Sequence, residues 1–86
     1  MNVHALKTWP AFYEDVALGT KSFEVRRNDR NFAVNDVLLL HEWQPDQKGD
    51  GGRFTGRLVA ARVTYVLRGP ILGIAEGWCV MGIKVV

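Results

Sequence analysis

One short segment of this chain has a helical pattern and almost everything after it is patterned as β-strands, which narrows the possible folds more than any other feature. The helical segment covers about residues 10–18, with Pro10 at its start and Gly19 just beyond its end. Phe12 and Val16 are four residues apart and therefore lie on one face. No later helix alternates with the strands, which argues against a βαβ fold. We predict a mostly β (α+β) domain with one or two short helices.

The strands are indicated by alternating residues or by short apolar runs. Polar and apolar side chains alternate from Lys21 to Arg26, as in a strand with one apolar face. Further strands are predicted at residues 2–8, 37–43, 57–67 and 78–86. Four or five such strands predict a small, curved antiparallel or mixed sheet that closes toward a barrel, with the helix at one opening.

Clusters of turn residues separate the strands. Residues 28–31 form one such turn, which a bond from the Asp29 side chain to the backbone would lock, and residues 35–36 form another. Residues 44–52 contain almost no apolar side chain, which predicts an exposed and mobile hairpin loop. Its glycines do not form a phosphate loop, because no Lys-Ser or Lys-Thr ending and no helix follow.

Length and composition favour one domain over residues 1–86. The chain has 86 residues, and 48% of them are hydrophobic, so a disordered chain is excluded. Cys79 is the single cysteine and is expected to be a buried, inert thiol. His4 and His41 lack a third ligand at suitable spacing, so we predict no metal site, and no motif indicates a cofactor.

The N-terminus also bears on localisation. Residues 1–10 have neither the basic start nor the apolar run of a signal peptide. No stretch approaches the roughly 18 apolar residues of a membrane span. We therefore expect a cytoplasmic protein with no membrane partner.

The basic residues are more informative in their position than in their number. The formal net charge is only +2, but Arg26, Arg27 and Arg30 fall within five residues and Lys21 lies just before them. Strand alternation places Glu24 and Arg26 on one face, and Lys21 precedes them at the bend. Lysine and arginine can hold a phosphate, and glutamate can accept from an exocyclic amine or orient the cations. The same pattern is equally typical of a set of solvated ion pairs, each of which contributes about 0–1 kcal/mol to the stability of the fold.

Residues 19–26 read G-x-K-x-x-E-x-R, which resembles the motif of ASCH domains, a branch of the PUA-like superfamily. The segments 4–7, 23–30 and 80–83 are also similar to those of short bacterial and phage proteins in that branch. The resemblance covers nearly the whole chain and implies a PUA-like small, curved β-barrel that binds RNA or a nucleotide. Two positions depart from the pattern: Asn35 replaces a glycine, which asparagine's tolerance of positive φ permits, and Glu24 stands where acylated-cytidine hydrolases of this kind carry threonine.

The leading hypothesis is a binding module for RNA or a nucleotide. Its candidate ligand-binding residues come from the motif, from the family-like start and from the turn after the motif: His4, Lys7, Lys21, Glu24, Arg26, Asn28, Arg30 and Glu42. The alternative is a small hydrolase, either an amidohydrolase on modified nucleosides or a ribonuclease, with Lys21 and Glu24 as catalytic residues. A protein-interaction module with an unused cleft is a third possibility.

Several of these residues have structural alternatives. His4 is either a polar group at the pocket or incidental, and Glu42 either faces the cleft and pairs with Lys21 or Arg26, or marks the solvent side. Arg27 has the opposite strand parity from Arg26 and is interpreted as a solubility residue. The aromatic residues offer stacking surfaces if exposed, but most of them are expected in the core.

Overall fold

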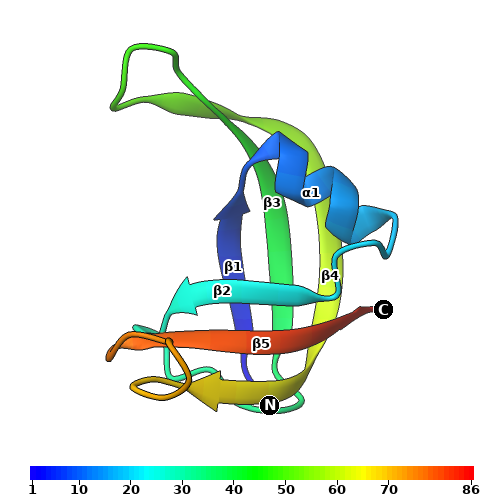
Figure 1. The fold of residues 1–86 in the computed structure, drawn as a ribbon. Coiled ribbons are helices and arrows are strands. Elements are labelled where there is room, and N and C mark those ends of the chain that lie inside the picture. The colour runs from blue at the N-terminus through cyan, green and yellow to red at the C-terminus, as the bar shows by residue number, and fades with distance from the viewer.

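The structure is a computed structural model that describes residues 1–86, and it consists of five strands and one helix (Figure 1). In chain order the elements are β1 (Val3–Thr8), α1 (Pro10–Ala17), β2 (Phe23–Arg27), β3 (Val37–Pro45), β4 (Gly52–Arg68) and β5 (Trp78–Val85). The predicted mostly β architecture with one short helix is confirmed. α1 is the only helix, and it is too short to cross a lipid bilayer.

All five strands belong to one curled sheet in the order β1-β3-β4-β5-β2. β1 and β3 are parallel, whereas the other neighbours are antiparallel, so the sheet is mixed. The 17-residue strand β4 pairs with β3 over its first part and with β5 over its last part. Figure 1 shows β4 bending between these partners, so that β2 and β5 cross in front of β1 and β3. The result is a half-barrel whose edge strands, β1 and β2, share no backbone ladder.

The core lies inside this curl and is built mainly of aliphatic side chains. Alternate residues of β1, β3 and β5 point inward, as their burial patterns show. Val16 of α1 and Phe32 from the turn after β2 complete the cluster. Cys79 is fully buried there, and this desolvation raises the pKa of its thiol, as expected for an inert cysteine.

α1 begins and ends as its sequence predicts. Pro10 is at the first helical position, and the N–H groups of Leu18 and Gly19 donate to Glu14 and Val16 at the C-terminal end. Gly19 has φ of 80°, a conformation that glycine adopts without steric cost. Tyr13 and Val16 are the buried residues of the helix, which sits over one end of the curl (Figure 1). This confirms the predicted place of the helix at one opening.

The hairpin between β3 and β4 is longer than predicted. Pro45 pairs with Gly52, so the loop shortens to residues 46–51 and β4 begins five residues before its predicted start at residue 57. The first seven residues of β4 are exposed, and therefore show no alternation between core and solvent. Figure 1 shows this part of the hairpin extending beyond the rest of the sheet.

A buried carboxylate ties the start of the chain to the turn before β3. Asp36 is 2% exposed and accepts hydrogen bonds from the N–H groups of Asn2 at 2.9 Å and Ala33 at 3.0 Å. Its Oδ2 also lies 2.8 Å from Nε2 of His4, whose ring packs edge-on against Phe32. The neighbouring Asn35 has φ of 75°, which confirms the predicted tolerance of positive φ at this turn.

Candidate functional site

The three motif residues converge on the carboxylate of Glu24. The side chain of Glu24 is 4% exposed, and Nζ of Lys21 donates to its Oε1 at 2.8 Å. Nε of Arg26 donates to its Oε2 at 2.9 Å. The carboxylate points inward because Glu24 is an inner residue of β2, and two cations compensate its burial. The three residues therefore form one compact cluster rather than separate surface charges.

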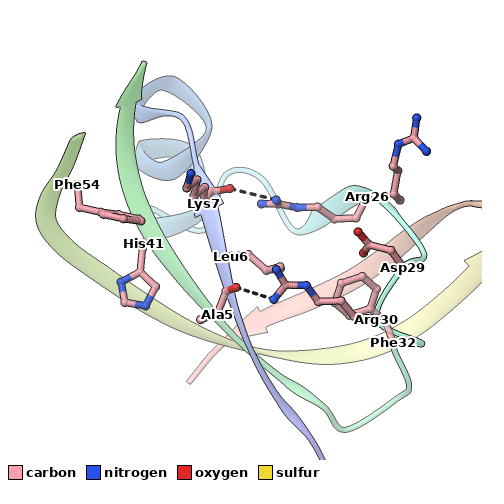
Figure 2. Close-up of a pocket in the computed structure, with 10 residues that line it drawn as sticks. Ala5, Leu6, Lys7, Arg26, Asp29, Arg30, Phe32, His41 and Phe54 are labelled. Carbon is pink, nitrogen blue, oxygen red and sulfur yellow. Dashed lines mark hydrogen bonds between the residues drawn. The ribbon is translucent and has the colours of Figure 1, made fainter. Parts of the chain in front are cut away.

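Arginine side chains connect the two edge strands of the half-barrel. Arg26 donates from Nη1 to the carbonyl of Lys7 at 3.0 Å and from Nη2 to Oγ1 of Thr8 at 3.1 Å. Arg30 donates to the carbonyl of Ala5 at 2.7 Å. Figure 2 shows both arginines reaching toward β1 from the side of β2. These bonds satisfy edge carbonyls that would otherwise be open to another strand.

Two cavities lie along this junction. The first, of about 720 Å³, lies between Arg26 and Arg30 on one side and His41 and Phe54 on the other, with β1 as its floor (Figure 2). The second, of about 620 Å³, lies between the start of α1 and β2. Both volumes are within the range of ligand pockets, about 300–1,000 Å³. The cavities share three lining residues, and all three are cations: Lys7, Arg26 and Arg27.

The junction carries more positive charge than the whole chain suggests. Lys7, Arg27 and Arg30 line the cavities but form no ion pair with a carboxylate. Asp29 and Glu24 are the acidic lining residues, and Glu24 already binds two cations. Because the chain as a whole has a net charge of only +2, its excess of base is concentrated here. Such a surface attracts an anionic ligand.

Exposed aromatic rings surround the second cavity. The rings of Trp9 and Phe12 are stacked with centroids 6.0 Å apart. The aromatic lining residues are between 38% and 55% exposed: Trp9, Phe12, Phe23 and Trp78. The expectation that most aromatic residues form the core is wrong, because aliphatic side chains fill the small interior. Exposed rings beside cations are the combination on which nucleobases stack.

Not every predicted site residue reaches the cavities. Lys7, Lys21, Glu24, Arg26 and Arg30 line one or both of them. His4 lines neither, since its ring is buried against Asp36. Its contacts are therefore those of a structural residue.

Glu42 and Asn28 also lie outside both cavities. Glu42 is buried, but it accepts from Thr55 at 2.7 Å and lies 3.7 Å from Arg57 rather than pairing with Lys21 or Arg26. Asn28 accepts a hydrogen bond from the N–H of Phe32 and so stabilises the turn. This was the role predicted for Asp29, whose side chain makes no such bond.

Arg27, His41 and Phe54 line the cavities although the sequence did not single them out as site residues. The parity argument fails for Arg27 because β2 is an edge strand, so side chains from both of its faces reach the cavities. Its guanidinium lies 5.5 Å from the ring of Trp78. Phe54 is in the part of β4 that precedes the predicted strand at residues 57–67, and His41 packs edge-on against it.

The chain is similar to a family of unknown function and to a protein of a phage. Residues 3–83 match a family model described as "Domain of unknown function (DUF3850)". The chain is also 41% identical, over 64 residues, to the "Uncharacterized 12.9 kDa protein in GpA 3'region" of Escherichia phage P2. That alignment covers 74% of this chain and 53% of the relative, so the chain spans about half of the relative's length.

Proposed function

The chain belongs to the DUF3850 family. The two cavities together form one cleft, and from this cleft we propose that the protein binds RNA or a nucleotide. The observation that carries the proposal is the pairing of unneutralised cations with exposed aromatic rings at one junction. Lys7, Arg27 and Arg30 would hold phosphate, and the rings of the second cavity would stack a base. The resemblance to ASCH domains and the PUA-like superfamily points to the same class of ligand.

The sequence suggests that Glu24 and Arg26 contact the ligand directly, but in this proposal they have a structural role. Their polar atoms are largely occupied by each other, by Lys21 and by β1. They therefore form the wall of the cleft and fix its shape, while the exposed cations meet the ligand. An Arg26 that already makes three hydrogen bonds still contributes its positive charge to the cavity.

The hydrolase alternative gains no specific support from the geometry. Both oxygens of Glu24 bind cations, which suits an orienting carboxylate better than a proton-transfer group. Thr20 and Ser22 carry the hydroxyl groups nearest to Glu24 in sequence, and neither group forms a hydrogen bond with Lys21 or Glu24. Binding without turnover is therefore the function that the cleft supports best.

Salt dependence provides a quantitative test. If three cations contact three phosphates of a single strand, the logarithm of the association constant falls with the logarithm of salt concentration with a slope near −2. The substitutions Lys7→Ala and Arg27→Ala should each weaken binding and make the slope shallower by about 0.7. Fluorescence anisotropy with a labelled eight-nucleotide single-stranded RNA, titrated between 50 and 200 mM salt, measures both quantities.

Lys84→Ala is the matched control, because Lys84 is an exposed cation that lines neither cavity. It should leave both affinity and slope nearly unchanged. If all three variants bind RNA equally, the cleft is not the binding surface. If the unmodified protein does not bind the eight-nucleotide RNA at the lowest salt, the proposed binding of single-stranded RNA is excluded. Free nucleotides then become the ligands to titrate.

A further inference from the structure

The two cavities are arranged as neighbours rather than as separate sites. Their common wall consists of Lys7 from β1 and of Arg26 and Arg27 from β2. On one side of this wall are the rings of His41 and Phe54, and on the other side are those of Trp9, Phe12, Phe23 and Trp78. The cleft thus alternates aromatic, cationic and aromatic surfaces.

This order corresponds to that of a dinucleotide, in which a phosphodiester joins two nucleosides. The cations of the common wall offer several N–H donors in one place, and arginine can meet a phosphate with two of them. Nζ of Lys7 also lies 5.9 Å from the ring centroid of Phe54, so the cation and the ring of the first cavity are adjacent. Phe54 is 57% exposed and is therefore open to stacking.

The geometry points to a ligand of two consecutive nucleotides, one base in each cavity, with the linking phosphate on Lys7 and Arg27 and with the positive charge of Arg26 beside it. This inference rests on the proposed function and deepens it, because it sets the smallest ligand that fills the site. A single nucleotide occupies one cavity and leaves the other rings unused. A single strand longer than two nucleotides leaves the cleft at both ends without further aromatic contacts in these cavities.

Isothermal titration calorimetry with the adenylate series pA, pApA and pApApA tests the inference. The step from pA to pApA should raise affinity by about tenfold or more, since each stacked base contributes roughly 1–3 kcal/mol. The step from pApA to pApApA should raise it much less. A dinucleotide that lacks its second base has the charge of pApA, and it should lose most of the gain.

Two variants assign the bases to their cavities. Phe54→Ala affects only the first cavity and Phe12→Ala only the second. In either variant pApA should bind little more tightly than pA. Tyr65→Ala is the control, because Tyr65 is an aromatic residue that is 63% exposed and lines neither cavity.

The possible outcomes separate this inference from the proposed function. Equal affinities for pA and pApA in the unmodified protein overturn the two-nucleotide site and leave nucleotide binding intact. Full retention of the dinucleotide gain in Phe54→Ala overturns the assignment of the first cavity to a base. A failure to bind the whole series together with the eight-nucleotide RNA ends both proposals.

Discussion

Replacing Glu24 with alanine is expected to lower the free energy of unfolding by about 2–4 kcal/mol and the melting temperature by roughly 10–20 °C. The carboxylate is buried and binds a different cation through each oxygen, so its removal leaves Lys21 and Arg26 without their acidic partner. Their side chains are 16% and 23% exposed and can turn partly toward water. The expected loss of free energy of unfolding is therefore at the low end of the range for breaking a buried ion pair.

The same substitution should loosen the junction between the edge strands. Glu24 holds Nε of Arg26, and this bond aims the remaining guanidinium nitrogens at β1. Without it, Arg26 loses its fixed orientation toward Lys7 and Thr8. Hydrogen exchange should therefore increase in β1 and β2 by more than in the central strands β3 and β4.

Glu14→Ala is the matched control for this prediction. Glu14 also forms an ion pair with an arginine, at 3.1 Å from Arg57, but both side chains are about half exposed. Its removal should cost less than about 1 kcal/mol. Thermal denaturation followed by circular dichroism compares the two variants, and similar melting temperatures would show that the Glu24 cluster contributes no more than a surface ion pair.

The motif residues are therefore mainly structural, and the groups available to a ligand lie beside them. Lys21, Glu24 and Arg26 do converge, as their spacing predicts, but their polar atoms mostly satisfy one another and the edge of β1. The cations without a carboxylate partner are outside this triad. Separate substitutions can thus distinguish folding effects from binding effects, which no single motif variant can do.

Local rules predicted the elements that carry a local pattern. Pro10 and Gly19 bounded α1, and alternation placed Glu24 and Arg26 on one face of β2, although only the structure shows that this face is the inner one and that Phe23 and Val25 are exposed. They failed where a strand has no buried face, as at the start of β4, where both faces of the hairpin are exposed. Local rules also could not predict the strand order β1-β3-β4-β5-β2, because strand neighbours depend on the bend of β4 and not on any local signal.

The candidate site shows the same limit. The cluster around Glu24 could be predicted because its members lie within six residues of one another. That Lys7 and Arg27 line the same cavities could not be predicted, since this arises from the approach of two edge strands that are distant in sequence. His4 shows the converse case: its place in a family-like segment suggested a ligand contact, whereas Asp36, 32 residues away, engages its ring.

Replacing Asp36 with alanine should destabilise the domain at least as strongly as the loss of Glu24, by about 3–5 kcal/mol. Three donors converge on this buried carboxylate, from Asn2, His4 and Ala33, and all of them lose their acceptor. Against a typical domain stability of about 5–15 kcal/mol, such a loss leaves little margin. Asp36→Asn keeps one acceptor oxygen and should fall between the alanine variant and the unmodified protein. Urea denaturation at neutral pH measures the differences, with Asp50→Asn in the exposed loop 46–51 as the control.

The pH dependence identifies the carboxylate itself as the cause. The hydrogen bond from Asn2, followed by the bond from His4, holds the pKa of Asp36 below its ordinary value. The unfolded chain therefore binds the proton more readily than the folded one, and the stability that Asp36 contributes is complete above about pH 4 and is lost as pH falls through the lowered pKa. The melting temperature of the unmodified protein should accordingly fall more steeply below pH 4 than that of Asp36→Asn, which has no such group to protonate. Parallel curves for the two proteins would mean that Asp36 acts through its shape alone, and that acid unfolding begins at other carboxylates.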